Sequence, residues 1–453
     1  MSSLVYSPAL QSILVLLGGM LVLLAGVPFF ANRRSAVSAV GLLIALGSLL
    51  PAQHAEGLEL IAILGVSLTL MIGAALNIDL ELDEHQPQFL ESMVLPLVAG
   101  IGVLTMAFAH NLFELAVGLE TLSLASAVWF GLGRGERALE AGFKYFLLGA
   151  ATFGLFLFGT ALIHLATGSF AFPSIPTAPD AQLLVLAGLG LVAAAIAFKL
   201  ALAPLHFGAL DGYTAAPPGA AGVVMAFSKL GAVFALTHLV LGGGSAGFSR
   251  VWTGFALVSI WVGVLGSLVQ TDLRRLLAYS AVGHAGFLAL AFSCGDSGVH
   301  AGLYYAVNYV VAVLLGFTAI SGKGTQAIHW EDLKRMELSP LRATAFALSL
   351  MSLAGIPPLP GFWAKLAVLG ASYSTLGLDV TALAALGGVV GVVYYLKPLP
   401  DLFAKIRHGR AEVQPITRLV LLVALVLFAT FALRPALAWQ ITDLARSAAV
   451  VQR

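Results

Sequence analysis

Residues 198–208, FKLALAPLHFG, place a lysine, a proline and a histidine inside a strongly apolar stretch. Pro204 cannot donate a backbone hydrogen bond, and its ring clashes with the preceding helical turn. Irregular backbone at membrane depth persists only where protein or a water-filled cavity satisfies its freed polar groups. The stretch therefore predicts a helix that is broken inside a membrane protein, with Lys199 and His206 beside the break.

The composition of the whole chain is typical of a membrane protein. Of its 453 residues, 59% are hydrophobic and 10% are charged, and the mean hydropathy is +0.97. Soluble domains carry about 25% charged residues. The net charge of +1 gives no basic surface for nucleic acid. We therefore expect an all-α polytopic membrane protein in a lipid bilayer, with no nucleic-acid partner.

Apolar stretches long enough to cross a bilayer recur along the chain and predict about fourteen transmembrane helices. The first stretch lacks a basic leader and is expected to be a retained span. The expected spans are 9–30, 36–53, 58–77, 91–109, 111–131, 140–165, 181–205, 218–240, 251–270, 276–293, 300–320, 339–373 (interrupted), 380–396 and 417–434.

Lysine and arginine in the predicted loops indicate how the chain is oriented. One set of alternate loops holds 14 basic residues: Arg33, Arg34, Arg134, Arg137, Arg274, Arg275, Lys323, Lys334, Arg335, Lys397, Lys405, Arg407, Arg410 and Arg418. The opposite set and the C-terminal tail hold 4: Arg250, Arg434, Arg446 and Arg453. The positive-inside rule places the first set in the cytoplasm. Both termini are then expected on the outer, periplasmic side.

Cysteine and histidine usage argues against several kinds of cofactor site. Cys294 is the single cysteine, so neither a disulfide framework nor a thiolate-ligated iron–sulfur cluster is expected within this chain. No two of the ten histidines lie within one helical turn, so a helical His-pair metal site is not expected. We expect no cofactor and no metal in this chain.

Five basic residues remain inside the predicted spans once the loop charges are assigned. They are Lys144, Lys199, Lys229, Arg342 and Lys365. Lys144 follows Glu140 by four residues near a span end, where the two can pair and the lysine can reach solvent. Arg342 is also near a span end. These two residues have an ordinary structural explanation.

Lys199, Lys229 and Lys365 lie deeper, and Glu120 is the acidic residue near mid-span. A lysine at the bilayer centre costs about 2.5–3.5 kcal/mol on insertion scales. A carboxylate and amines in such a place are suited to holding and passing protons, because moving one partner changes the proton affinity of the other. A static ion pair that fixes helix packing is the alternative.

His206, His238 and His284 could add groups that titrate near neutral pH. Any one of them alone is more often a satisfied core histidine. Beside the deep lysines, we expect His206 and His284 to take part in a relay.

A second break is expected at SLAGIPPLPGFWAKL (352–366), where three prolines and two glycines prevent a continuous helix. In transporters built from inverted repeats, broken helices at corresponding positions mark the transport site. The two breaks are five spans apart, which predicts two five-helix units. The predicted segments are 1–90 (three N-terminal helices), 91–245 (first unit), 246–400 (second unit) and 401–453 (C-terminal helix and tail). Lys199 precedes its break, whereas Lys365 follows its break.

Four stretches together carry a family resemblance. FKLALAPLHFGALDGYTAAPPGAAGVVMAFSKLGAVFAL (198–236), QTDLRRLLAYSAVGHAGFLAL (270–290), AGFKYFLLGA (141–150) and LAGIPPLPGFWAKL (353–366) resemble the antiporter-like subunits of respiratory complex I and of multisubunit cation/proton antiporters. The resemblance covers roughly residues 90–400. It implies fourteen helices with two inverted five-helix repeats, each containing a broken helix, and a proton path along a polar axis.

The resemblance also implies roles for individual residues. The family's proton-transfer groups correspond to Glu120, Lys199, Lys229 and Lys365. His206 and His284 stand where the family's relay histidines and water link these sites.

Within the family, the resemblance favours the N-type subunit of NADH:quinone oxidoreductase. Lys365 resembles the N-type or L-type, because the M-type usually carries a glutamate there. The chain ends at residue 453 without a long amphipathic helix, which disfavours the L-type.

Membership would make this chain a proton-translocating subunit in an energy-transducing inner membrane. Its partners would be neighbouring antiporter-like and small membrane subunits of complex I, and indirectly the peripheral redox arm. NAD, FMN, iron–sulfur clusters and quinone would then be bound by partner subunits. Three alternatives remain open: a subunit of a Na⁺/H⁺ antiporter, a subunit of a membrane-bound hydrogenase-type complex, and a structural scaffold that moves no ion.

Overall fold

The computed structural model confirms an all-helical membrane architecture. It describes residues 7–30, 34–76, 88–133, 135–216, 218–321, 329, 333, 335, 338–408, 413, 415–437, 439–440 and 442–443. Within these residues, ten helices are long and apolar enough to cross a membrane. Four shorter apolar helices lie at Leu10–Gly26, Glu91–Ala107, Pro340–Ala354 and Thr417–Leu433. Several basic residues used for the orientation, including Arg33, Arg134, Lys323 and Arg453, lie outside the described residues.

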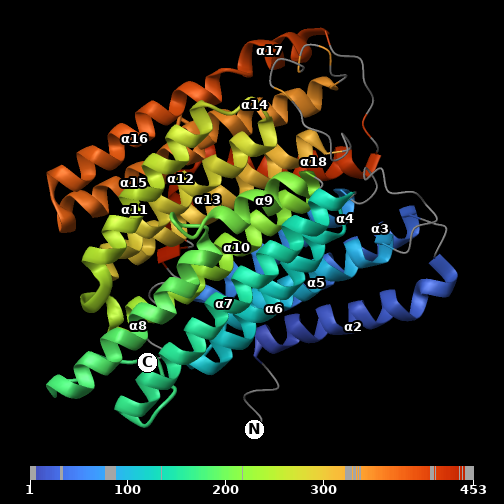
Figure 1. Cartoon of the computed structure of the whole chain (residues 1–453). Helices are drawn as coiled ribbons and strands as arrows, with labels where there is room; N and C mark the ends of the chain where they lie inside the picture. The colour runs from blue at the N-terminus through green and yellow to red at the C-terminus, as the bar shows by residue number, and fades with distance from the viewer. Residues whose placement is uncertain are drawn as a thin grey trace.

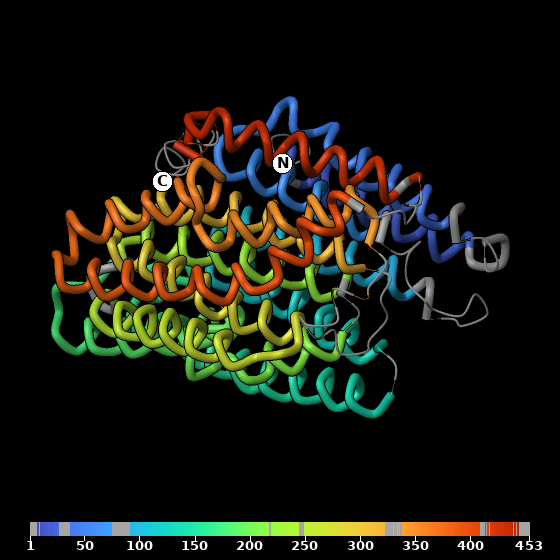
Figure 2. The backbone as a smooth tube through the Cα atoms, turned by 90° about the horizontal axis from the view of Figure 1, so that it is seen from above, coloured from blue at the N-terminus to red at the C-terminus, as the bar shows by residue number. Residues whose placement is uncertain are grey.

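The helices run side by side along one common direction (Figures 1 and 2). The N-terminal half contains α2 (Pro8–Phe30), α3 (Arg34–Gly47), α4 (Gly57–Leu76), α5 (Gln88–Ala107), α6 (Leu112–Gly131), α7 (Glu136–Thr167), α8 (Pro179–Leu200), α9 (Phe207–Ala215) and α10 (Pro218–Leu239). The C-terminal half contains α11 (Ser245–Leu268), α12 (Leu273–Ser293), α13 (Asp296–Ile320), α14 (Pro340–Ala354), α15 (Pro360–Leu376), α16 (Leu378–Leu396), α17 (Leu399–His408) and α18 (Pro415–Leu433).

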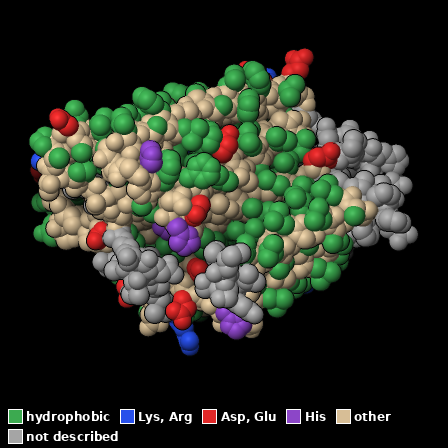
Figure 3. All heavy atoms as spheres, turned by 90° about the horizontal axis from the view of Figure 1, so that it is seen from below, with side chains coloured by type: hydrophobic (Ala, Val, Ile, Leu, Met, Phe, Trp, Pro, Cys, Tyr) green, Lys and Arg blue, Asp and Glu red, His purple; other side chains and the backbone are tan. Residues whose placement is uncertain are grey.

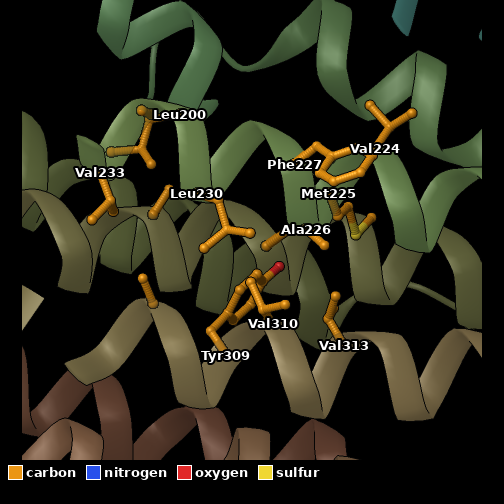
Figure 4. Close-up of a cluster of buried hydrophobic side chains, with 14 of the residues drawn as sticks. Leu200, Val224, Met225, Ala226, Phe227, Leu230, Val233, Tyr309, Val310 and Val313 are labelled. Carbon is orange, nitrogen blue, oxygen red and sulfur yellow. The ribbon is translucent and has the colours of Figure 1, made fainter. Parts of the chain in front are cut away.

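The centre of the bundle is formed by α10, α12 and α13, whose residues are almost all buried. Helix α10 packs against α13 and so joins the two halves of the chain. Figure 4 shows Ala226 and Leu230 of α10 facing Tyr309 and Val310 of α13. At the edge of the bundle, α18 crosses back to contact α4 as well as α13 (Figure 2).

The outer helices expose apolar side chains. Leu139 and Phe143 on α7, Leu386 and Val389 on α16, and Leu21 on α2 are all exposed. The face drawn in Figure 3 has broad apolar areas and few lysine or arginine side chains. A soluble monomer rarely exposes apolar surface on this scale. These helices are therefore suited to contact with lipid or with neighbouring membrane subunits.

Two groups of helices make corresponding contacts. In the first group, α5 packs on α6 and α10, while α7 packs on α6, α8 and α9. In the second group, α11 packs on α12 and α16, while α13 packs on α12, α14 and α15. Each helix from α5 to α10 thus corresponds to the helix whose number is six higher, from α11 to α16. Corresponding helices pack against corresponding partners.

Both predicted helix breaks are present. Helix α8 ends at Leu200, followed by Ala201 in a left-handed conformation (φ 64°), and α9 begins at Phe207. Helix α14 ends at Ala354, followed by Gly355 (φ 86°), and α15 begins at Pro360. The seventh predicted span, 181–205, was too long, because the helix ends at Leu200, four residues before Pro204.

The early end of α8 follows from the chemistry of proline. In an α-helix the N–H of residue i bonds to the carbonyl of residue i−4. Proline has no N–H, and its ring clashes with that carbonyl. Pro204 therefore leaves the Leu200 carbonyl without a helical donor. Pro357 and Pro358 do the same for the carbonyls of Leu353 and Ala354.

At each end of the bundle, an isolated backbone bridge joins two of the connections between helices. Asp272, before α12, forms an isolated antiparallel bridge with His329 in the α13–α14 connection. Asn111, before α6, forms another with Ala171 in the α7–α8 connection. The first pair lies beside predicted cytoplasmic arginines and the second lies on the opposite side in the predicted topology.

Candidate functional site: lysines at the helix breaks

The first lysine, Lys199, lies in the last turn of α8 and is 1% exposed. Its Nζ donates a hydrogen bond to Tyr145 Oη of α7 at 3.3 Å. The same ammonium lies 5.5 Å from the centroid of the Tyr145 ring, within range of a cation–π contact. A buried lysine thus has one neutral oxygen and one aromatic face as partners.

Glu120 of α6 lies within electrostatic range of Lys199. The two side chains form no ion pair within 4.0 Å, although both are among the described residues. Glu120 Oε2 is buried and has no hydrogen-bond partner within the described structure. The structure therefore brings the predicted pair together as neighbours that are not in direct contact.

The second lysine, Lys229, is fully buried on α10 at the centre of the bundle. Its Nζ donates to the Leu200 carbonyl at 2.7 Å. This is the carbonyl that Pro204 leaves without a helical donor. The ammonium also lies 5.8 Å from the Tyr213 ring centroid of α9. The broken helix thus supplies the acceptor that a buried lysine needs.

The third lysine, Lys365, repeats this arrangement at the second break. Its Nζ donates to the carbonyls of Leu353 and Ala354, at 2.9 and 2.8 Å. These are the two carbonyls freed by Pro357 and Pro358. The lysine therefore lies at the negative end of the α14 dipole, where a cation is favoured.

His284 of α12 is buried and has a hydrogen-bond partner on each ring nitrogen. Nδ1 lies 2.6 Å from Tyr305 Oη of α13, and Nε2 lies 2.9 Å from Tyr395 Oη of α16. The Tyr395 hydroxyl is also hydrogen-bonded to Ser280 Oγ of α12. His284 lies within electrostatic range of both Lys229 and Lys365.

The other predicted residues are placed differently. His206 is buried at the start of α9, beside the rings of Phe207 and Tyr279, and its Nδ1 has no partner in the described structure. No direct contact links it to the deep lysines among the described residues. His238 is hydrogen-bonded to the Ala107 carbonyl at 2.9 Å and stacks on Phe172, in keeping with a satisfied core histidine.

The two shallow basic residues have structural partners, as the sequence suggested. Lys144 Nζ lies 2.7 Å from Glu140 Oε1 and 3.5 Å from Asp211 Oδ2, and the three side chains are partly exposed. Arg342 donates to the Ser321 carbonyl at 2.6 Å. Among the described residues, no group of three or more His, Cys, Asp or Glu gathers as a metal site would require.

Sequence reasoning missed the tyrosines. Tyr145, Tyr213, Tyr305 and Tyr395 each contact one of the deep lysines or His284. Tyrosine is common in membrane helices, so its presence alone carries no signal. Their positions become meaningful only once the helices that face one another are known.

Comparison with known proteins places this geometry in a family. Residues 109–391, more than half of the chain, match the family described as NADH:quinone oxidoreductase/Mrp antiporter, transmembrane. The chain belongs to this family. The matched region of this antiporter-like chain contains all four predicted proton-transfer residues and both helix breaks.

One relative of this family member is NADH-quinone oxidoreductase subunit N of Cereibacter sphaeroides. It is 37% identical over 323 residues, which are 70% of this chain and 70% of the relative. A chain of respiratory complex I from Thermus thermophilus with bound aureothin is similar in structure. Its TM-score is 0.78 at 28% identity, covering 95% of this chain and 98% of that one.

The fold of this family member extends to other respiratory complexes. A chain of the membrane-bound sulfane sulfur reductase, an archaeal respiratory membrane complex, has a TM-score of 0.85 at 23% identity. The alignment covers 98% of this chain and 97% of that one. At this identity the likeness concerns the fold alone.

Proposed function

We propose that this chain is the N-type, proton-translocating membrane subunit of NADH:quinone oxidoreductase. The observation that carries the proposal is the pair of lysines, Lys229 and Lys365, each held on proline-freed carbonyls at a helix break. The names of the relatives assign such a chain to subunit N. Electron transfer and quinone reduction belong to partner subunits, which supply the energy for proton movement.

The proton path is proposed to run through Glu120, Lys199, Lys229, His284 and Lys365. Glu120 and Lys199 are electrostatic neighbours, and Lys199 in turn interacts with Lys229. His284 interacts with Lys229 on one side and Lys365 on the other. A charge that arrives on one group therefore changes the proton affinity of the next. His206 is proposed to lie on a side branch of this proton path near the end of α8, because no direct contact joins it to the lysines in the described residues.

The topology proposed is fourteen membrane crossings with both termini on the outer side. The corresponding contacts of α5–α10 and α11–α16 support two inverted five-helix units, 91–245 and 246–400. The three helices of 1–90 and the segment 401–453 flank them. An offset of five crossings reverses the direction of the second unit relative to the membrane.

Partners proposed for this chain are the neighbouring membrane subunits of an inner-membrane complex. The exposed apolar faces of α7 and α16 support side-by-side packing with other membrane helices. A subunit of a multisubunit Na⁺/H⁺ antiporter is the second candidate, because the family description includes Mrp antiporters. A hydrogenase-type or sulfur-reducing complex is a third, on the strength of the fold.

Purification of the chain in mild detergent, followed by mass spectrometry and reconstitution, separates these candidates. We expect subunits that bind NADH and quinone to copurify with the chain. We also expect quinone reduction to generate a proton gradient that does not depend on sodium. A sodium-driven proton gradient without redox subunits would contradict the proposal and support the antiporter. Copurification with subunits of a hydrogenase or a sulfur reductase would also contradict it.

A further inference from the structure

Four polar side chains of the second five-helix unit form a continuous hydrogen-bonded chain. Tyr305 Oη bonds His284 Nδ1, His284 Nε2 bonds Tyr395 Oη, and Tyr395 Oη bonds Ser280 Oγ. All four side chains are buried. They come from three helices, α13, α12 and α16, so the chain crosses the unit and does not follow one helix.

Cavities lie at both ends of this chain of side chains. The first is lined by Tyr305, Asn308, Tyr309 and Ser352, among others. The second is lined by Ser280, Phe287, Lys365 and Tyr394, among others. His284 borders both cavities, and each has room for about one water molecule. Tyr305 thus opens to one cavity, and Ser280 opens to the other beside the Lys365 amine.

A neutral imidazole donates from one ring nitrogen and accepts at the other. With a hydroxyl on each side, one tyrosine must donate to His284 while the other accepts from it. Hydroxyl hydrogens rotate freely, so the direction of the whole chain can reverse. Two tyrosine partners already satisfy both ring nitrogens of His284. A purely structural histidine would not need the further hydrogen bond from Tyr395 to Ser280, which extends the chain to the second cavity.

We propose that Tyr305, His284, Tyr395 and Ser280 carry protons between the first cavity and the Lys365 cavity. This inference rests on the proposed function and names how the second unit joins its two water sites. Tyr305, Tyr395 and Ser280 become proton-transfer residues, and His284 is the group in the middle that can hold the charge.

Each step conserves protons. Tyr305 gives its hydroxyl proton to His284 Nδ1 and takes a proton from the first cavity. His284 releases the proton of Nε2 to Tyr395 Oη, and Tyr395 gives its own proton to Ser280 Oγ. Ser280 passes its proton into the second cavity, toward Lys365. Rotation of the hydroxyls and a change of imidazole tautomer restore the starting state.

The charged and titratable groups around His284 come from four neighbouring helices. Lys229 of α10 and Lys365 of α15 lie within electrostatic range. Tyr309 of α13 packs its ring 5.0 Å from the imidazole, centroid to centroid. Tyr394 of α16 lies next to Tyr395, with ring centroids 4.2 Å apart. Movement of charge between the two lysines would therefore favour proton transfer through His284 in one direction.

The test uses the assembled complex in vesicles, with Tyr305→Phe and Tyr395→Phe compared against Tyr304→Phe. Tyr304 is a matched control because it is a buried tyrosine of α13 that packs on Trp439, outside the hydrogen-bonded chain. Assembly is checked first by the yield of intact complex. Lys229→Ala is measured in parallel as the test of the proposed function itself.

Each of the two chain variants should lower the proton pumping that quinone reduction drives by about tenfold or more, because a positioned proton-transfer group typically contributes about 10²–10⁴-fold in rate. Tyr304→Phe should pump normally. Normal pumping by both chain variants, with Lys229→Ala impaired, would overturn the inference and leave the proposed function standing. Normal pumping by Lys229→Ala would overturn the proposed function and the inference with it.

If a phenylalanine variant fails to assemble, 3,5-difluorotyrosine at the same position keeps the ring and the hydroxyl while making the phenol more acidic. A proton-transfer role predicts a shifted pH profile of pumping and a changed solvent isotope effect. An unchanged pH profile and isotope effect at both positions 305 and 395 would overturn the inference.

Discussion

Each deep lysine is held by neutral oxygen atoms. Lys199 bonds a tyrosine hydroxyl, and Lys229 and Lys365 bond backbone carbonyls. A hydrogen bond from a charged donor contributes about 1.5–3 kcal/mol, whereas breaking a buried ion pair costs about 3–5 kcal/mol. Neutral acceptors therefore allow an ammonium to lose its proton more readily than a buried carboxylate partner would.

At the same scale, Glu120→Gln should reduce the proton pumping that quinone reduction drives by about tenfold or more. Glutamine cannot bind and release a proton as the Glu120 carboxylate does. The glutamine keeps the size of the side chain on α6. Glu140→Gln is the control, because Glu140 is exposed and pairs only with Lys144 among the described residues. Pumping rates of both complexes in vesicles decide the point. Equal rates in the two variants would argue for a static role of Glu120.

At the scale of the helix, prolines determine where the lysines bind. The residue four positions before each proline loses its helical donor. This rule relates Pro204 to the Leu200 carbonyl, and Pro357 and Pro358 to the carbonyls of Leu353 and Ala354. Lysine amines occupy all three carbonyls. The breaks thus create acceptors in the interior of the bundle without adding a charged side chain.

Pro204→Ala would return an N–H that competes with Lys229 for the Leu200 carbonyl. A net backbone hydrogen bond is worth about 0.5–1.5 kcal/mol, so pumping should fall by about two- to tenfold. Pro96→Ala is the control, because α5 continues through Pro96 without a break. Pumping by the two reconstituted complexes gives the comparison. A Pro204→Ala complex that pumps at the wild-type rate would refute the role given to this proline.

Gly361 allows the start of α15 to approach the end of α14 closely. A Cβ at this position would lie 1.9 Å from the Ser352 carbonyl oxygen. Gly361→Ala should therefore destabilise the complex by about 1–3 kcal/mol, the usual cost of overpacking. Gly370→Ala on the same helix, where a Cβ meets nothing within 4 Å, should leave the Tm unchanged or raise it. Thermal unfolding that ranks the two variants in the opposite order would contradict this account.

The sequence predicts the breaks and the deep charges well, because both are local chemical anomalies in apolar stretches. Pro204 and Lys199 are conspicuous without any knowledge of the fold. The tyrosines Tyr305 and Tyr395 are not, because their hydrogen bonds to His284 depend on α12, α13 and α16 facing one another. The end of α8 at Leu200 was also missed, since the effect of a proline reaches back a full turn. Hydrogen-bond partners that come from distant helices require the structure.

At the scale of the whole molecule, the contact between α10 and α13 joins the two proposed five-helix units. Lys229 lies on α10, and Tyr305 and Tyr309 lie on α13, so this contact brings the polar groups of the two units near each other. The apolar outer helices surround this polar centre and isolate it from lipid. The arrangement suits a path that runs across the units in the plane of the membrane before it reaches an exit.

The proposed topology predicts which loops face each side of the membrane. With Cys294 replaced by serine, Thr177→Cys and Ala404→Cys each place one thiol at an exposed position. An impermeant maleimide should label position 177 from the outside and position 404 only from the cytoplasmic side. Labelling of right-side-out and inverted vesicles distinguishes the two. Labelling of both positions from one side would contradict the topology.

We propose that the lysines at the helix breaks move protons across the membrane. The most direct measurement is the number of protons pumped per quinol formed by the intact complex carrying Lys229→Ala, with Lys144→Ala as the exposed-lysine control. We expect normal assembly with pumping reduced by about tenfold or more for Lys229→Ala, and normal pumping for Lys144→Ala. An assembled Lys229→Ala complex that pumps as many protons per quinol as the wild type, at the same rate, would contradict it.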